Sequence, residues 1–435
     1  MEACRTIRLT AACLGAAACL VSMASSALPH VRTSGSDFNM DGLRAAAGSV
    51  SAAVGDYHYV QAADGMLAVY RKHDGFMLRG PFAASALFAG AGGQRCAAGG
   101  TSHTEVLFDH TARRWIVAYR TADHPALVCL AVSDSGNPAG SYHPYVVKAP
   151  GASADEDLRL VALVDGYYFS IGAQVCGIDR QALLREVAPD AHCHTLSVPA
   201  MPVVGTGELA RAGPALFLGL DGQAARLLLW RFSLRGNRLR GPQKVAIAPF
   251  QLASLVSQPI PGAALAAFGD RVAPRPVVWN GAGHQSLLAT HPVLMTGGQL
   301  GLRWYDIALR HGAPTLRQQG SFAPDGDSRW MASIGVDKAG DMALAYAITS
   351  PDTPPGIRYN GRERGDAAGR MQAEEVIFNG NGVQPTRADH ELPAGELLLD
   401  PVDRCTFWYT QRYLPSTGNG NWHTRITRFK FEACR

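Results

Sequence analysis

The stretch "DPVDRCTFWYTQRYL", from Asp400 to Leu414, decides how we expect this chain to fold. An acidic turn is followed by a run of aromatic residues, and soon afterwards "HTRITRFKFEACR" ends the chain with a cysteine next to last. The end of a chain usually frays. So much aromatic surface and a cysteine in this place indicate instead that the end of the chain closes a ring.

The turn at Asp400 belongs to a degenerate repeat. The stretches "FDHTARRWIVAY", "VDKAGDMALAY" and "LDPVDRCTFWY" each contain a strand ending in Asp, a short turn and a strand ending in Tyr. An Asp that opens a hairpin caps the turn by accepting backbone N–H bonds. Elsewhere, short apolar runs alternate with Gly, Pro, Asp and Asn, and "RQALLREV" (180–187) is the only convincing helical stretch.

These hairpins need partners, because a hairpin cannot bury its apolar face alone. Stacking repeated hairpin units radially solves this problem. We therefore predict an all-β fold, a single β-propeller of about seven blades over residues 51–435, with six or eight blades as alternatives. Its N- and C-terminal strands would pair to close the ring, with "HYVQAADGMLAVY" (58–70) as the expected partner of the Trp408 strand.

Two β-sandwich domains are the alternative fold. They would require a polar linker near the middle of the chain, and "RVAPRPVVWNGAG" (271–283) is the nearest candidate. The apolar content of 47% argues against disorder. The formal charge of +4 is spread without a dense basic run, which argues against a nucleic-acid partner.

The N-terminus predicts export. Residues 1–27 contain two arginines, an apolar Ala/Leu/Cys run and then small residues, as in a secretory signal peptide. We expect residues 28–50 to be a flexible segment and expect no transmembrane segment, because no later apolar run is long enough. Nearly all of the basic residues are arginines, which is typical of a GC-rich bacterial genome. We therefore expect a bacterial protein that is secreted, periplasmic or on the cell surface.

Export also determines how the cysteines are interpreted. An even number of cysteines in an oxidising compartment predicts disulfides. The last two mature cysteines open one strand and end the next, so an antiparallel hairpin would bring them together. The middle two flank the helical stretch, which leaves the first two as the third pair. The six residues are Cys96, Cys129, Cys176, Cys193, Cys405 and Cys434.

Several of these stretches resemble a family of largely uncharacterised bacterial secreted proteins. "CTFWYTQRYL…NWHTRITRFKF" looks like the C-terminal signature of that family, and "LFDHTARRWIVAY", "VCGIDRQALL" and "PPGIRYNGR" resemble its other segments, in order along nearly the whole mature chain. The family looks like a propeller, sometimes carried within larger surface proteins, and has no established activity. The resemblance therefore implies a fold and a location.

The chain also departs from this family. An "RWGDYS"-like element is replaced by "RADHELPAGELLL", and "GDPIV" is replaced by "SHTEV". If those Gly-Asp elements form a site or bind an ion, the resemblance implies that the site is degraded here.

Two motifs have the residue types of metal sites. "DFNMDG" (37–42) matches the first half of a calcium loop, but the twelfth position is Gly48 where a bidentate Glu is needed. His192 and His194 flank Cys193, which is expected to be oxidised. We therefore expect no cofactor, with Ca²⁺ only a weak alternative.

The candidate ligand-binding residues are arginines, tryptophans and one glutamate. Arginines that converge on a propeller axis can grip a carboxylate, and with a glutamate they would form a sialidase-like arrangement. The other interpretations are a surface loop with salt bridges, and core tryptophans whose neighbouring arginines cover the rim. The candidates are Arg303, Trp304, Arg329, Trp330, Arg358, Arg362 and Glu374.

Three functions remain open. The leading hypothesis is a non-catalytic binding or adhesion module for a glycan or a protein, at the cell surface or outside the cell. The first alternative is a sialidase-like, carbohydrate-active hydrolase that uses residues at the propeller axis. The second is a purely structural surface component. An enzyme would need acids and a basic residue that converge at the propeller mouth.

Overall fold

The computed structural model describes most of the chain after the predicted signal peptide. The described residues are 28–35, 38–45, 50–89, 94–98, 101–121, 127–149, 156–205, 213–281, 283–309, 313–386 and 395–435. The signal peptide itself, residues 1–27, lies outside this set.

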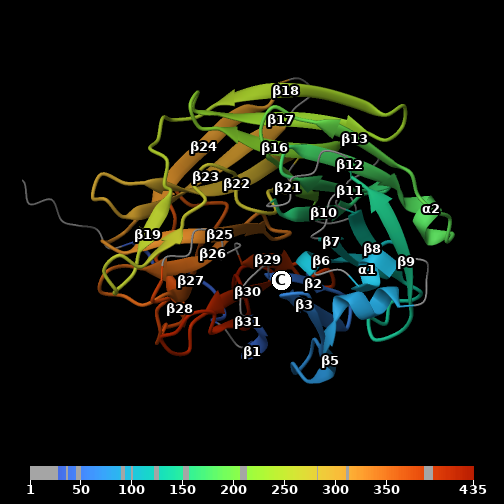
Figure 1. The fold of residues 1–435 in the computed structure, drawn as a ribbon. Helices are drawn as coiled ribbons and strands as arrows, with labels where there is room; N and C mark the ends of the chain where they lie inside the picture. The colour runs from blue at the N-terminus through green and yellow to red at the C-terminus, as the bar shows by residue number, and fades with distance from the viewer. Residues whose placement is uncertain are drawn as a thin grey trace, which may run out of the picture.

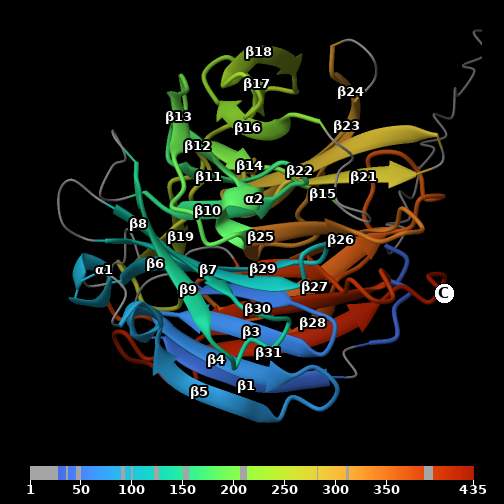
Figure 2. The ribbon, with the colours of Figure 1, turned by 90° about the vertical axis from the view of Figure 1, so that its right-hand side faces the viewer.

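Seven sheets fan around a central axis, which is the arrangement of a seven-bladed β-propeller (Figures 1 and 2). Neighbouring blades contact each other through their first strands, so the first strand of each blade lies nearest the axis. Blade 1 contains β2 (Val50–Val54), β3 (His58–Ala63), β4 (Met66–Arg71) and β5 (Met77–Ala83). Blade 2 contains β6 (Thr101–Asp109), β7 (Arg114–Thr121), β8 (Leu127–Ser133) and β9 (Tyr142–Lys148). Blade 3 contains β10 (Leu158–Ala162), β11 (Gly166–Ile171), β12 (Gln174–Asp179) and β13 (Ala191–Thr195).

The remaining blades follow the same plan. Blade 4 contains β14 (Ala200–Pro202), β16 (Ala215–Asp221), β17 (Arg226–Ser233) and β18 (Arg238–Ala246). Blade 5 contains β15 (Val204–Gly205), β21 (Val277–Gly281), β22 (His284–Leu294), β23 (Leu300–Leu309) and β24 (Thr315–Phe322). Blade 6 contains β25 (Ser328–Val336), β26 (Met342–Thr349), β27 (Gly356–Arg362) and β28 (Glu375–Phe378). Blade 7 contains β29 (Glu396–Leu399), β30 (Thr406–Tyr413), β31 (Trp422–Lys430) and β1 (Phe38–Ala45).

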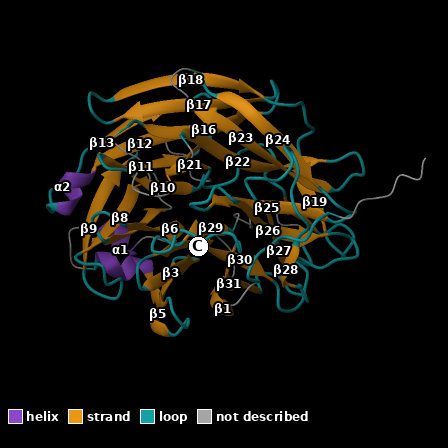
Figure 3. Cartoon of the chain, turned by 180° about the vertical axis from the view of Figure 1, so that it is seen from behind, coloured by secondary structure: helices purple, strands orange, loops and turns teal. Residues whose placement is uncertain are grey.

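The other elements lie outside the seven sheets. The short helices α1 and α2 lie at the periphery of the ring (Figure 3). The helical stretch predicted at 180–187 corresponds to α2. No helix in the described residues is long and apolar enough to span a membrane. These elements are α1 (Gln94–Ala98), α2 (Arg180–Leu184), the 3-10 helix η1 (Ala84–Phe88) and the hairpin of β19 (Leu255–Ser257) and β20 (Ala264–Ala266).

Strands from the two ends of the chain close the ring, as predicted. β1 pairs antiparallel with β31, with Phe38 opposite Arg428. The prediction that residues 58–70 pair with the Trp408 strand was wrong, because β3 and β4 each have both edges occupied within blade 1. The closing strand instead lies in the segment 28–50 that was predicted to be flexible. Residues 58–70 instead pack against the face of the C-terminal blade: the ring centres of Tyr59 and Trp408 lie 5.2 Å apart.

Apolar side chains fill the space between neighbouring blades. The largest buried residues include Trp115, Trp304, Trp330 and Trp408, each at most 1% exposed. Most buried clusters draw mainly on two adjacent blades, as in the cluster shared by blades 2 and 3, whereas one joins blades 1 and 7 to parts of blades 5 and 6 and the β19–β20 hairpin. The propeller therefore has its core between blades, and every blade depends on its neighbours.

All three disulfides form as predicted, between Cys96 and Cys129, Cys176 and Cys193, and Cys405 and Cys434. The last of these joins the residue before β30 to the segment after β31. It therefore ties together the hairpin that completes the ring.

The predicted Asp turns are also present. Asp109, Asp337 and Asp400 each lie between the first and second strands of a blade. Their side chains accept backbone N–H bonds from the turn that follows. Because the first strands surround the axis, these turns gather at one end of it.

Candidate functional site

Four charged side chains meet at the propeller axis: Glu105, Arg159, Arg275 and Glu396. They come from β6, from β10, from the residues before β21, and from β29. Nη1 of Arg159 lies 3.1 Å from Oε1 of Glu105 and 3.4 Å from Oε1 of Glu396. Arg275 reaches the other oxygen of each acid, at 3.1 Å from Glu105 and 3.0 Å from Glu396. Each carboxylate is therefore bridged by both arginines, and we call this set the axial quartet.

The axial quartet is buried, and each of its acids contacts both arginines and one further hydrogen-bond donor. The side chains of Glu105 and Glu396 are 2% and 0% exposed. Ser51 Oγ donates a further hydrogen bond to Glu105, and the backbone N–H of Ala52 donates one to Glu396. Burial, together with the nearby Glu396 carboxylate, raises the pKa of Glu105, although both arginines oppose this shift. Such a pair has neither the access nor the room for substrate and water that glycoside hydrolysis requires.

The network continues from the axial quartet to a partly exposed acid. Nη2 of Arg159 donates to Asp157 at 2.8 Å, and His103 lies 2.6 Å from the other oxygen of Asp157. Burial raises the pKa of Asp157, but Arg159 and His103 outweigh this and hold the pKa well below its usual value. Asp157 is therefore ionised, and its charge is already paired.

A cavity of about 460 Å³ lies along the axis at the end where the Asp turns gather. We call it the axial pocket. Its walls come mainly from apolar residues of the first strands, and Arg275 also lines it. Charged groups from the turns line it too. The lining residues used below are Val54, Phe108, Leu399, Asp56, Asp400 and Arg404.

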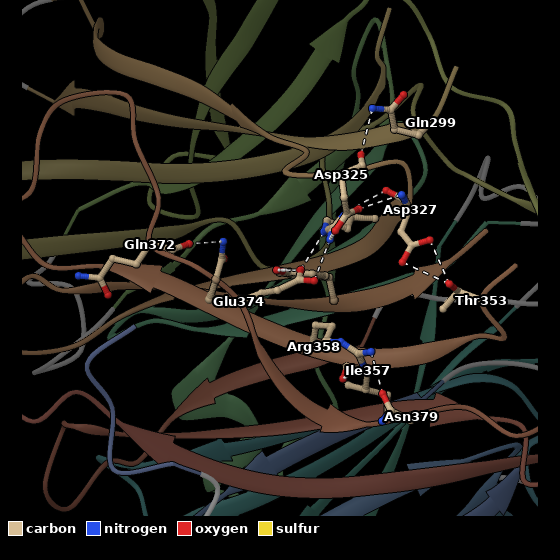
Figure 4. Close-up of polar contacts among 12 residues, drawn as sticks. Gln299, Asp325, Asp327, Thr353, Ile357, Arg358, Gln372, Glu374 and Asn379 are labelled. Atoms are coloured by element: carbon tan, nitrogen blue, oxygen red, sulfur yellow. Dashed lines mark hydrogen bonds and ion pairs between the residues drawn. The ribbon is translucent and has the colours of Figure 1, made fainter. Parts of the chain in front are cut away.

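Two of the candidate residues predicted from sequence, Arg329 and Glu374, form an internal network in blade 6 (Figure 4). Arg329 donates from Nε and Nη2 to Glu374, from Nη1 and Nη2 to Asp325, and from Nη1 to the carbonyl of Asp327. These bonds use all five donors of a guanidinium group. Tyr346 also donates to Glu374 at 2.8 Å. Arg329 therefore has no donor left for a ligand.

Three more candidates are engaged in contacts within the protein. Arg358 donates to the carbonyls of Ile357 and Phe378 and to Asn379. Arg303 donates to Ser321 and to the carbonyl of Ala248. Trp330 is 1% exposed. The structure therefore places these residues in packing and surface roles.

The sialidase-like alternative would need Arg358 and Arg362 at the propeller axis, and the structure places neither of them there. Both lie in β27, the third strand of blade 6, whereas β25 is the first strand and faces the axis. Arg358 bonds within its own blade, and Arg362 reaches Gln318 of blade 5. The axis is occupied by the axial quartet instead.

Arg362 and Trp304 come together in a second cavity of about 420 Å³ between blades 5 and 6, which we call the inter-blade cleft. The guanidinium of Arg362 lies 5.4 Å from the centre of the Trp304 ring, and its Nη1 donates to Gln318. Val336 lines both cavities, so the inter-blade cleft adjoins the axial pocket. Its other polar and aromatic lining residues are Trp279, His284, Ser286, Asp306, Arg317, Glu363 and Arg364.

None of the four residues of the axial quartet was predicted from the sequence, although a signal was present. Glu105 and Glu396 each stand four residues before the Asp of a hairpin repeat, at Asp109 and Asp400. Each is a charged residue within or beside the apolar run of an inner strand. Such a strand is buried, so a charge in it is unexpected. Both also fall within segments where the chain departs from the resembling family. A charge at a repeated position in an inner strand therefore marked the axis.

The described residues of the two metal motifs lie in strands. Asp37 lies outside the described residues, and Phe38–Gly42 belong to strand β1. Cys193 is in a disulfide within strand β13, beside His192 and His194. Among the residues that the structure describes, no group of three or more His, Cys, Asp or Glu side chains could hold a metal ion.

Comparison with known proteins relates this chain to others by fold alone. No protein-family model and no curated protein matches it. A Lactobacillus plantarum protein of known structure matches with a TM-score of 0.42 and 11% identity, over 77% of this chain and 87% of the other. The N-terminal domain of Nup159 matches with a TM-score of 0.40 and 9% identity, over 93% and 98%. A thermostable family-43 glycoside hydrolase matches with a TM-score of 0.35 and 10% identity, over 77% and 91%.

Proposed function

We propose that this protein is an exported, non-catalytic binding module that holds a protein ligand at the axial pocket. The single observation that carries this proposal is the state of the axial quartet. Its two acids are buried and each is bridged by both arginines. The axial quartet can help to hold a neighbouring ligand, but its two acids are not free to act as an acid or base.

The chemistry of the axial pocket favours a protein ligand over a glycan. Val54, Phe108 and Leu399 provide apolar surface, while Asp56 and Arg404 add charge. An apolar side chain inserted into such a pocket, with polar groups around it, is the usual anchor of a protein interface. A sugar would bring hydroxyl groups against apolar walls, where they would lose hydrogen bonds to water.

The experiment is to narrow the pocket and measure binding. Leu399 is partly exposed and lines the pocket, so Leu399→Trp should fill part of the cavity. Leu252 is 43% exposed and does not line it, so Leu252→Trp is the matched control. Peptide and glycan arrays probed with the mature protein should show peptide binding that Leu399→Trp weakens at least about tenfold and Leu252→Trp preserves.

The competing functions predict other results. A hydrolase would turn over glycosides in a substrate panel, which we expect the protein not to do. A glycan-binding axial pocket would bind glycans in a way that Leu399→Trp weakens, and a structural component would bind neither array. Peptide binding that survives Leu399→Trp would place the ligand elsewhere and refute the axial site.

A further inference from the structure

The inter-blade cleft contains hydrogen-bond donors without acceptors. Trp279, Trp304 and Arg362 line it and are at most 5% exposed. Their atoms Nε1, Nε1 and Nε are buried, and each lacks a hydrogen-bond partner among the described residues. Buried donors normally find acceptors, because an unpaired one costs about 1–3 kcal/mol. The walls of the cleft therefore favour a ligand rich in acceptor oxygens.

A positive charge lies at the opening of the same cleft. Arg364 is exposed, and no hydrogen bond or ion pair joins its side chain to the part of the chain that the structure describes, although its charge opposes the burial that raises the pKa of the nearby Asp341. By contrast, Arg317 is paired with Asp306, and Arg362 donates to Gln318. Arg364 is therefore the arginine of the cleft that can offer its planar guanidinium to a carboxylate.

The cleft also contains acceptors of its own. Asp306 accepts hydrogen bonds from Arg317 and Gln318 and keeps a small exposed fraction, 9% of its side chain. Glu363 forms an ion pair with Arg32 through one oxygen and has an 18% exposed side chain. These acids would repel an inorganic anion, which carries only acceptors and negative charge. They can instead accept hydrogen bonds from hydroxyl groups.

We propose that the inter-blade cleft binds a carboxylated sugar. The sugar carboxylate pairs with Arg364, and its hydroxyl groups donate to Asp306 and Glu363. Its remaining oxygens face the donor-rich wall of Trp279, Trp304 and Arg362. A neutral sugar would leave Arg364 unmatched, and phosphate would leave the two acids unmatched. The volume of about 420 Å³ lies within the range of small-ligand pockets.

The test compares a charged sugar with its neutral ester. Digalacturonate and its dimethyl ester share the same hydroxyl groups, and the ester replaces each carboxylate with a neutral methyl ester. Isothermal titration of the mature protein should show about tenfold tighter binding of the acid, the usual value of one charge-assisted hydrogen bond. Arg364→Gln should abolish this preference. The matched control is Arg370→Gln, an exposed arginine of the following loop that does not line the cleft.

Other outcomes would overturn the proposal. It fails if acid and ester bind equally, if neither binds, if Arg364→Gln leaves the preference unchanged, or if inorganic phosphate binds as tightly as digalacturonate. Arg364→Lys should restore part of the preference, because it returns the charge without the planar fork. The inference is independent of the axial pocket: Leu399→Trp should leave digalacturonate binding intact, so failures at the two sites can be told apart.

Discussion

Asp109 and Asp337 occupy the same place in two blades, yet their surroundings differ. Both follow an inner strand, both are at most 1% exposed, and both cap their turn through Oδ1. Oδ2 of Asp109 accepts hydrogen bonds from Arg180 at 2.6 Å and Tyr167 at 2.7 Å. Oδ2 of Asp337 has no partner among the described residues. The same local motif therefore carries a compensated charge in blade 2 and an uncompensated one in blade 6.

The two carboxyl groups titrate in opposite directions as a result. Burial raises the pKa of Asp109, but hydrogen bonds from Arg180 and from the backbone N–H of Ala112 lower it by more. The net shift of this pKa is therefore downward. Burial and the nearby Asp341 raise the pKa of Asp337 to about 7, against the N–H bonds of its turn. The comparison teaches that the turn is specified locally, whereas the cost of its charge depends on what the neighbouring blade supplies.

The largest expected effect comes from removing the cation beside Asp109. Arg180→Met would leave a buried, unpaired carboxylate and should lower the free energy of unfolding by about 3–5 kcal/mol. Denaturant titration at pH 7 measures this. The matched control is Arg226→Met, whose pair with Asp221 spans 3.6 Å and is about one-third exposed on both sides; it should cost no more than about 1 kcal/mol. Equal losses in the two variants would show that Asp109 does not need its cation.

The next prediction tests the sign of the comparison through pH. Because the folded pKa of Asp337 lies above that of the unfolded chain, the native state binds the extra proton, and stability falls as pH rises from about 4 to about 7. Asp337→Asn should remove this slope and raise the free energy of unfolding by on the order of 2–4 kcal/mol at pH 8, with little change near pH 4.

Asp109→Asn is the control for this titration and should behave in the opposite way. Its lowered pKa means that the ionised form contributes stability above the unfolded pKa, which is lost as pH falls through the folded pKa. The variant should therefore be destabilised throughout pH 4–8, because the folded pKa lies below this range and the loss with falling pH occurs only in more acidic solution. Denaturation of both variants across pH 4–8 decides the matter, and parallel curves for the two would refute the assigned difference.

A smaller effect is expected at Asp400, the third turn of this kind. Lys72 from blade 1 lies 3.1 Å from Oδ1, but Trp408 Nε1 and the N–H of Val402 also donate to this carboxylate. Lys72→Met should therefore lower the melting temperature by less than Arg180→Met, corresponding to about 1–2 kcal/mol. Arg71→Met, at an exposed pair with Asp74, is its control and should change stability little. A loss as large as that of Arg180→Met would mean that the other donors contribute nothing.

Much of the fold was predictable because it rests on short-range patterns. The Asp-to-Tyr repeat predicted the hairpins, because an Asp before a turn caps it wherever it occurs. The cysteine positions predicted the disulfides, because strand ends in a hairpin are neighbours. The closing strand was assigned wrongly, since Phe38–Ala45 carries no repeat motif and has its meaning only opposite β31.

The candidate site was less predictable, for a related reason. Arg329 and Trp304 looked available for a ligand in sequence, but their availability depends on contacts made by Glu374, Asp325 and the next blade. Sequence shows which side chains have donors, and only packing shows which donors are already used. The axial quartet was overlooked because its members come from four separate blades.

By itself, the sequence determined the class of fold, the radial stacking of hairpins, the disulfide partners and the capped turns, because each depends on residues that are close along the chain or on the need to bury an apolar face. Only the tertiary structure decided which strand closes the ring and which charges are compensated. It also decided where cavities remain. The counterion of Asp109 lies 71 residues away and that of Asp400 lies 328 residues away. The first pair requires two consecutive blades to pack together, and the second requires the ring to close.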